Sequence, residues 1–458
     1  MARSNLSNQN ITEGVIWKQL LSFFFPILLG TFFQQMYNTV DTIIVGRAVG
    51  TQALAAVGAT SALINLVSGF FMGLSTGVTV IVSQTYGARD EEGVSRAIHT
   101  GMALSLVLGV MIILIGGLGG PWVLRMTQIP ESCYEDAVLY IHIYFAGSIA
   151  FMVYNMGASI LRALGDSTRP TIFLIIACLV NIVMDLVCVV WFKMGIAGAA
   201  IATVLSQIVS AVLVVITMMR QPEETKLRFS ELKIHGHLLR RVLMIGIPGG
   251  LQFITFDLSN LLIQSSVNSF GETTIAAWTA YQKTDALSWM ILNSFGIAAT
   301  TFVGQNYGAQ KYDRIRRSVW TCIEMNCLAV MLTSGTILLF RREILGIYTT
   351  DLSVIEAGAQ VMMWIIPFNV TFCAVEVFAG AMRGTGYSIV PTIANILCVC
   401  VFRILWVWAV VSQHHTLHTL SMAYPLSWIL ALVCFTVMYF RGNWLRKPIQ
   451  AGEPIYDD

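Results

Sequence analysis

The sequence predicts an all-α polytopic membrane protein with twelve transmembrane helices in two pseudo-symmetric six-helix bundles. Its composition, its recurrent long apolar segments and an internal repeat all point to this fold. Of the 458 residues, 56% are hydrophobic and only 11% are charged, less than half the usual share of charge in soluble domains. Twelve spans of about 20 residues would take about 240 residues. Because only short loops remain, we expect no separate catalytic domain, no enzyme activity, no cofactor and no nucleic-acid partner.

The apolar segments begin after a polar N-terminal stretch (1–15). The first one contains Pro26 and runs on without a small-residue cleavage site, so we interpret it as a span and not as a signal peptide. The expected spans are 16–40, 53–82, 95–119, 137–160, 170–192, 195–217, 240–267, 274–303, 318–340, 354–381, 388–411 and 418–440. An even number of spans places both termini on one side of the membrane.

The positive charges are distributed unevenly among the loops. Twenty of the 27 lysine and arginine residues fall in the termini and the loops on the side of the termini, and five fall in the opposite loops. Cytoplasmic loops carry such an excess. We therefore expect a multi-pass protein of the cell membrane with both termini in the cytoplasm.

An internal repeat with a constant offset divides the chain into two halves. The segment Gln84–Arg89 recurs at 305–310, and Arg162–Gly165 recurs at 383–386. We expect an N-terminal bundle (1–217), a cytoplasmic linker (218–239), a C-terminal bundle (240–440) and a cytoplasmic tail (441–458). Two like-oriented bundles around a central cavity are a recurrent transporter design, although channels and structural proteins can be duplicated as well.

Ionisable residues inside the spans of the first half suggest an ion site. Asp41 shares a helical face with Tyr37, and Asn181 and Asp185 lie four residues apart on the fifth span. Both helices rise from the same side, so the two aspartates are expected at similar depth. Two carboxyl groups in a pocket of low polarity could hold a proton or a sodium ion. Alternatively, each aspartate caps a helix end or borders water separately.

The second half offers Asp257, Asp285 and Glu376 as cation-binding groups. Glu376 precedes Arg383 by seven residues, as Asn155 precedes Arg162, so the two positions are equivalent in the repeat. The alternative for Asp257 and Asp285 is a role at a helix kink or as a partner of Lys283 or Arg403. The nine cysteines lack metal-ligand spacing, and we expect no metal site apart from a possible sodium ion at Asp41 and Asp185.

Several segments together resemble the multidrug and toxic compound extrusion (MATE) transporters. These are Gln35–Asp41 with Gly46, the repeated Gln-x-Tyr-Gly-Ala, Arg162–Asp166 with Pro170, Asn181–Asp185 and Gly195–Ala200. The resemblance extends from about residue 17 to residue 440. It implies a V-shaped pair of bundles with a central cleft that opens alternately inward and outward.

The resemblance also implies a function: antiport of small amphipathic organic cations outward against inward protons or sodium. In members with an N-terminal ion site, the two acids correspond to Asp41 and Asp185, with Asn181 beside them. Tyr37, Asn155 and Thr203 match polar positions that line the same pocket. Another branch of the family carries acids in the seventh and tenth spans, where this chain has Phe256 and about Phe372, so a C-terminal ion site does not follow.

We therefore expect a secondary active multidrug exporter that acts as a monomer, with membrane lipid around it. The alternative is a flippase for a lipid-linked saccharide or cell-wall precursor, which a related family with the same architecture performs. Such a protein needs a basic cleft for a pyrophosphate, whereas only Lys283 and Arg403 are basic residues away from the ends of the expected spans. A membrane-embedded transferase or sensor would need its active groups gathered at one membrane face, and the acids are spread along the spans.

Overall fold

A computed structural model describes residues 11–126 and 130–445, and within these ranges the chain is helical without any β-strand. In the described part of the chain, eleven helices are long and apolar enough to cross a membrane. The helices α4 (Glu131–Ala146) and α5 (Ser148–Ala163) meet at an angle of 47° and count as a twelfth span when taken together. The all-α polytopic fold predicted from the sequence is confirmed.

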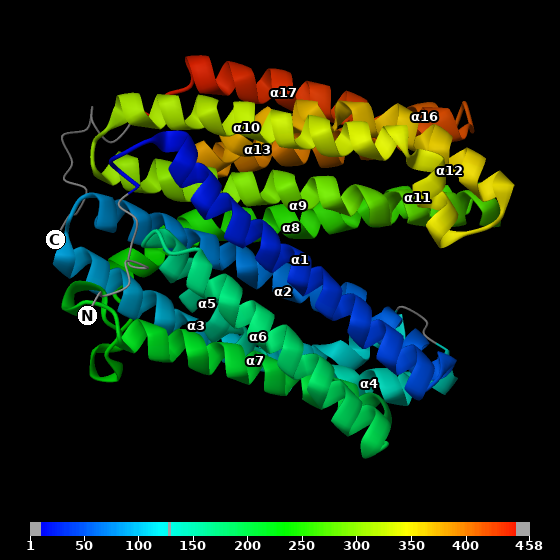
Figure 1. Cartoon of the computed structure of the whole chain (residues 1–458), viewed down its shortest axis with the longest axis horizontal. Coiled ribbons are helices and arrows are strands. Elements are labelled where there is room, and N and C mark those ends of the chain that lie inside the picture. The colour runs from blue at the N-terminus through cyan, green and yellow to red at the C-terminus, as the bar shows by residue number, and fades with distance from the viewer. Residues whose placement is uncertain (1–10, 127–129, 446–458) are drawn as a thin grey trace. The chain divides into compact units, whose positions relative to one another are not determined.

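The first half contains seven α-helices and one π-helical turn (Figure 1). Besides α4 and α5, they are α1 (Ile16–Ala48), α2 (Thr51–Gly87), α3 (Glu91–Met126), α6 (Thr168–Asp185), η1 (Leu186–Trp191) and α7 (Gly195–Met219). Apart from residues 147 and 192, the expected spans of the first half fall within these elements, and several helices extend beyond them: α1 continues past residue 40 to Ala48. Helices of 33 to 37 residues such as α1 and α2 are longer than the roughly 20 residues that a bilayer core requires.

Two short 3₁₀ turns precede the second half, and its helices are interrupted more often than those of the first half. Its elements, with these turns first, are η2 (Glu223–Thr225), η3 (Phe229–Glu231), α8 (Gly236–Asn268), α9 (Glu272–Gly308), α10 (Tyr312–Leu339), α11 (Arg341–Tyr348), α12 (Leu352–Ile365), η4 (Ile366–Phe368), α13 (Asn369–Gly384), α14 (Ile389–Asn395), η5 (Ile396–Val401), α15 (Phe402–Trp406), η6 (Val407–Val411), α16 (Leu417–Ser421) and α17 (Ala423–Arg441).

The backbone itself repeats at the same offset as the sequence motifs. Helices α1 and α8 have 33 residues each, and α2 and α9 have 37 each. Three pairs of residues with positive φ are related by this offset: Gly50 and Gly271, Arg89 and Gln310, and Gly165 and Gly386. Because side-chain-bearing residues rarely adopt such a conformation, the pair Arg89 and Gln310 marks a turn that both halves have kept.

Packing divides the chain at slightly different places from the repeat. The first unit contains Leu21–Gly250, and the second contains Thr12–Leu20 and the chain from Leu251 onward. Helix α8 therefore starts in the first unit and continues in the second. The bundle limits expected from the sequence, 217 and 240, follow the internal repeat. They stay a prediction about how the chain is organised.

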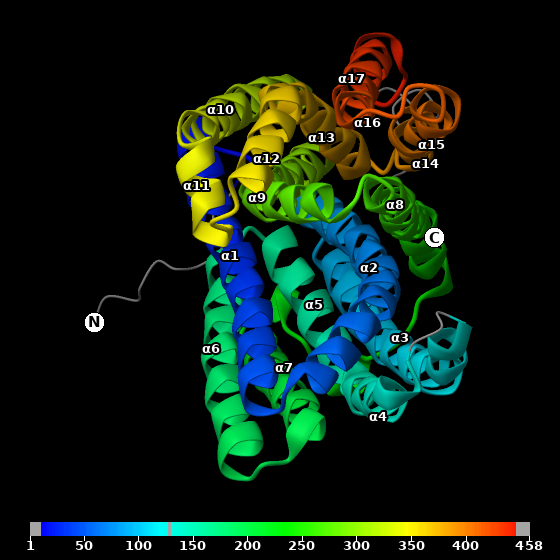
Figure 2. The same ribbon diagram turned by 90° about the vertical axis from the view of Figure 1, so that its right-hand side faces the viewer.

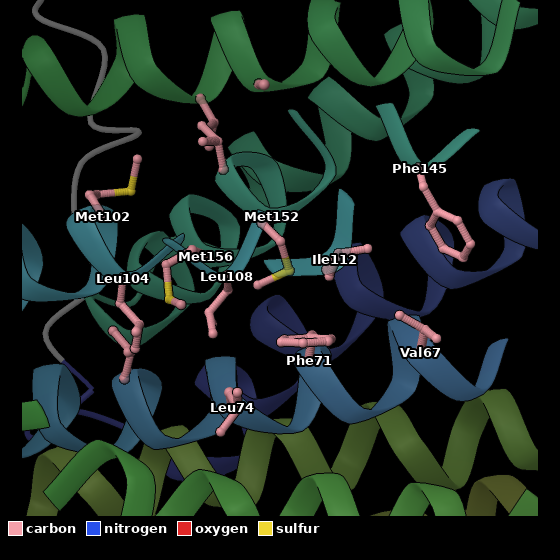
Figure 3. Packing of buried hydrophobic residues seen from close by; sticks show 14 of the residues in the cluster. Val67, Phe71, Leu74, Met102, Leu104, Leu108, Ile112, Phe145, Met152 and Met156 are labelled. Carbon is pink, nitrogen blue, oxygen red and sulfur yellow. The ribbon is translucent and has the colours of Figure 1, made fainter. Parts of the chain in front are cut away.

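The core of the first unit is apolar and rich in methionine. Met152 and Met156 on α5 lie beside Leu74 and Phe71 on α2, and Met102 on α3 belongs to the same cluster (Figure 3). Helix α5 packs against α2, α3 and α7. Methionine fills irregular gaps between helices because its side chain is unbranched and flexible.

In the second unit, α9 is the central helix. It packs against α10, α12 and α13, and α13 packs in turn against α17, as both views show (Figures 1 and 2). Helices α9 and α13 approach closely at small residues: a Cβ atom built on Gly380 would lie 2.6 Å from the carbonyl oxygen of Gly296. This close approach brings the polar groups of α9 and α13 together.

The linker is fastened to α3 by two neighbouring residues. Nε2 of His99 accepts a hydrogen bond of 3.0 Å from the amide of Arg228, while its Nδ1 lies 2.7 Å from the carbonyl oxygen of Ser95. The hydroxyl of Thr100 lies 3.0 Å from Nδ1 of His235. His99 thus binds the linker through Nε2, while the contact of Nδ1 with its own helix fixes the orientation of the ring.

Candidate ion and substrate site

Helices α1 and α6 run parallel in a fixed register. The Thr171 hydroxyl, at the fourth residue of α6, donates a hydrogen bond of 2.6 Å to the carbonyl oxygen of Pro26, the eleventh residue of α1. From this bond α1 continues to Asp41 and α6 continues to Asp185, and the two segments differ in length by a single residue. At about 1.5 Å per residue both segments are about 21–23 Å long. The register therefore carries the two aspartates to the same depth.

The two carboxyl groups meet at this depth in the first unit. The side chains of Asp41 and Asp185 interact directly, and their exposed fractions are 7% and 0%. Oδ1 of Asp41, both carboxyl oxygens of Asp185 and both amide atoms of Asn181 are buried without a hydrogen-bond partner in the described part of the chain. Buried polar groups normally have partners, so five adjacent atoms without any form an unusual concentration.

Hydroxyl groups border the two aspartates. Tyr37 on α1 faces the side chains of Thr203 and Ser206 on α7, but its hydroxyl has no partner in hydrogen-bonding geometry among the described residues. Tyr140 and Tyr144 on α4 also interact with Asp41, and their rings stack at 6.2 Å. Sequence reasoning missed these two tyrosines, although their spacing of four residues places them on one helical face.

Asp185 also lies at a change of helix type. It is the last residue of α6, and the π-helical turn η1 begins at Leu186. Such turns occur often at functional sites because they disturb the regular hydrogen bonding of the helix. The second unit has a π-helical turn at the equivalent place, η6, but it is preceded by Trp406. Both halves therefore have a π-helical turn at this position, but the carboxyl group that precedes it in the first half has no equivalent in the second.

Asn155 does not join the pair through any described contact. Its side-chain amide donates a hydrogen bond of 2.8 Å to the carbonyl oxygen of Phe151, one turn earlier on α5. Arg162, two turns later, donates to Ser159 at 3.1 Å. Both contacts are local to α5.

In the second unit Asp285 is the centre of a buried network. Its Oδ1 accepts 2.7 Å from Asn369, and its Oδ2 accepts 3.0 Å from the indole of Trp289 and 3.3 Å from the hydroxyl of Tyr281. Only 3% of Asp285 is exposed. Asn369 was not predicted, because the sequence does not show which face of α13 meets α9.

Asp257 and Glu376 are the other two acids that the sequence predicts to bind cations, and they lie apart from this network. Glu376 accepts a hydrogen bond of 3.0 Å from Arg383, and their side chains are 15% and 16% exposed. Asp257 on α8 is exposed, and so is Lys283 on α9. The described residues contain no group of three or more His, Cys, Asp or Glu side chains that could hold a metal ion.

Comparison with known proteins matches this architecture. The family model described as MatE matches the chain twice, at residues 26–187 and 248–408. The chain is 26% identical to the probable multidrug resistance protein YoeA of Bacillus subtilis (strain 168), over 97% of both chains. It is 23% identical to the probable multidrug resistance protein NorM of Thermotoga maritima, over 99% of this chain and 98% of that one.

Solved structures agree in fold. An outward-facing multidrug resistance MATE family transporter of the MOP superfamily superposes with a TM-score of 0.89 at 21% identity, covering 96% of this chain and all of the other. A MOP superfamily transporter from Pyrococcus furiosus has a TM-score of 0.87 at 21% identity, over 97% and 99% of the two chains. With two matches to the family model, one in each half, and the same fold, the chain belongs to the MATE family of membrane transporters.

Proposed function

We propose that the chain is a secondary active multidrug exporter of the cell membrane, with both termini in the cytoplasm. It exports amphipathic organic cations in exchange for protons or sodium ions that enter the cell. The observation that carries this proposal is the contact between Asp41 and Asp185, which lie side by side with buried oxygen atoms that have no partner among the described residues. The names of the relatives, which are multidrug resistance proteins, support the substrate class.

Two neighbouring carboxylates repel each other strongly where water is scarce, because the low dielectric weakens the screening of their charges. A proton or a sodium ion relieves this repulsion. The oxygen atoms of Asn181 and Asp185 are suitable ligands for sodium, and a proton could be shared between the two carboxyl groups. The site therefore has a reason to take up one monovalent cation.

Coupling requires that ion and drug bind with different affinities to the two states of the transporter. Tyr37 interacts with both Asp41 and Thr203. Tyr37 and Thr203 therefore connect the ion site to helix α7. We assign these two residues and Asn155 to the substrate path. Of the three acids predicted to bind cations in the second unit, Asp257 is the exposed one, while Asp285 and Glu376 already have donors.

The test is uptake of a fluorescent organic cation into inside-out vesicles or proteoliposomes, under separately imposed proton and sodium gradients. We expect one of the gradients to drive transport, and Asp41→Asn and Asp185→Asn to abolish it. Asp313→Asn, at an exposed aspartate in the first turn of α10, serves as the matched control and should transport normally. Transport at the wild-type rate by Asp41→Asn would refute the ion site, and transport of a lipid-linked saccharide in place of any cation would favour a flippase.

A further inference from the structure

We propose that Arg403 is a tethered counter-ion for Asp285. The second unit thus contains its own cation, whereas the first unit must bind one from solution. This inference rests on the proposed function, because it assigns ion uptake to the first unit alone. It concerns residues of α9, α13, α15 and α17, which all belong to the second unit.

The anion of this arrangement is fixed in place. Three donors from two helices hold the carboxyl group of Asp285, at 2.7, 3.0 and 3.3 Å. All three donors, Asn369, Trp289 and Tyr281, are neutral. Hydrogen bonds from neutral groups favour the charged form of a carboxyl group, but they leave its net charge uncompensated. A buried charge of this kind needs a cation nearby.

Arg403 on α15 supplies that charge. Its exposed fraction is 2%, and arginine stays protonated in proteins. The guanidinium group lies 4.0 Å from the ring centroid of Tyr424, and its Nε donates to Ser427 at 3.0 Å. Nη2 is buried without a hydrogen-bond partner in the described ranges. Arg403 is therefore held over an aromatic ring, with Nη2 still without a hydrogen-bond partner among the described residues.

Two tyrosines join the anion and the cation. Tyr281 donates its hydroxyl proton to Asp285 and interacts electrostatically with Arg403. Tyr424 carries the guanidinium group on its ring and interacts with Asp285. The opposite charges thus share both phenol groups, although no described contact pairs them directly. Together they are neutral overall, which is the state that a membrane interior favours.

The surrounding titratable groups leave this balance intact. Among the described titratable side chains, Tyr281, Tyr424 and Cys400 interact directly with Arg403, so its compensation of Asp285 acts across the two tyrosines. On α13, Glu376 is paired with Arg383. On α9, Lys283 is exposed, two residues away from Asp285 on another face of the helix.

The first unit differs in this respect. Position 182, which the internal repeat makes equivalent to Arg403, is Ile182. The carboxyl oxygens of Asp185 are buried without a partner among the described residues, so Asp41 and Asp185 have no arginine of their own. An external cation can bind at Asp41 and Asp185, where no guanidinium group compensates the carboxylates. It gains little binding free energy at Asp285, where the guanidinium group of Arg403 already compensates the charge.

The experiment measures ion binding with the first unit silenced. Purified Asp41→Asn/Asp185→Asn protein is compared with the same protein carrying Arg403→Gln, by ²²Na⁺ binding and by proton uptake on acidification. We expect Arg403→Gln to add one bound sodium ion or one proton per protein. Arg403→Lys, which keeps the charge, and Arg403→Gln/Asp285→Asn, which removes both charges, should add none.

The outcomes separate the two proposals. If Arg403→Gln adds no ion, or if the added ion persists after Asp285→Asn, the tethered counter-ion is refuted whatever the first unit does. If the wild type and Asp41→Asn/Asp185→Asn bind the same number of ions, the ion site of the first unit fails instead. Should Arg403→Gln not fold, Asp285→Asn in the silenced background leaves Arg403 uncompensated, and we expect this variant alone to bind ³⁶Cl⁻. Its failure to do so would also overturn the inference.

Discussion

Gly250 of α8 touches the backbone of α2 at Phe70: a Cβ atom built on Gly250 would lie 2.6 Å from the carbonyl oxygen of Phe70. One turn earlier, a Cβ atom on Gly246 would lie 2.7 Å from Cα of Leu74. Gly73 and Gly77 form the opposite side of the contact. Small residues spaced by four let two helices in a membrane approach to backbone contact, and here both helices contribute such a pair.

This contact predicts a sharp difference between two adjacent glycines. Gly250→Ala should lower stability by about 1–3 kcal/mol, because the new methyl group meets backbone that cannot move aside easily. Gly249→Ala is the control, since its Cβ atom would lie 3.6 Å from the nearest atom, the carbonyl oxygen of Gly73, which is ordinary contact. Thermal unfolding in detergent measures both. Equal melting temperatures for the two variants would contradict the close packing of α2 and α8.

Asn181 should show opposite effects on stability and transport. Both of its side-chain amide atoms are buried without partners among the described residues, and an unsatisfied buried group costs about 1–3 kcal/mol. Asn181→Leu should therefore raise the melting temperature and abolish gradient-driven export. Asn326→Leu is the comparison: its Oδ1 is also without a partner among the described residues, but its amide donates to the carbonyl oxygen of Cys373 at 3.4 Å, so this variant should raise the melting temperature less than Asn181→Leu does. A lower melting temperature for Asn181→Leu would show that this amide is satisfied in the protein.

The pair of Glu376 and Arg383 should matter more for stability than a surface pair. Glu376→Gln leaves Arg383 partly buried without its anion, and we expect a loss of about 3 kcal/mol. Glu92→Gln on α3 breaks the exposed pair with Arg96 and should cost less than about 1 kcal/mol. Unfolding of both variants under the same conditions tests this, and a smaller loss for Glu376→Gln than for Glu92→Gln would be inconsistent with the geometry.

The linker should loosen in acid because of His235. Burial lowers the pKa of His235 below its ordinary value of 6.5, and the charges of Arg96 and Lys233 act in the same direction. The folded linker therefore favours the neutral ring, so its contribution to stability is complete above about pH 6.5 and is lost as the pH falls below that value.

Hydrogen exchange of the linker amides at pH 7.5 and pH 5.5 measures this effect. We expect faster exchange at pH 5.5, after correction for the intrinsic rate, in the wild type and in His237→Gln. His237 is the exposed neighbour and serves as the control. His235→Gln should lose most of the difference between the two pH values, and a difference of the same size in that variant would assign the effect to another group.

The spans and the repeat could be predicted because hydropathy and motif spacing are properties of the chain alone. The contact between Asp41 and Asp185 follows from helix rise and a common starting point, which the Thr171–Pro26 bond supplies. The network of Asp285 could not be predicted, because its donors come from α9 and α13 and depend on the rotation of each helix about its axis. The glycine pairs of α2 and α8 are visible in the sequence, but hydropathy does not reveal which helices they join.

The division of α8 at Gly250 separates the unit of duplication from the unit of packing. A gene cut at the linker would give a first fragment whose α2 exposes Gly73 and Gly77 to lipid, because the turns of α8 that cover them would be on the other fragment. A present-day half expressed by itself should depend on the first turns of α8, supplied in trans as a short peptide, to reach its native packing.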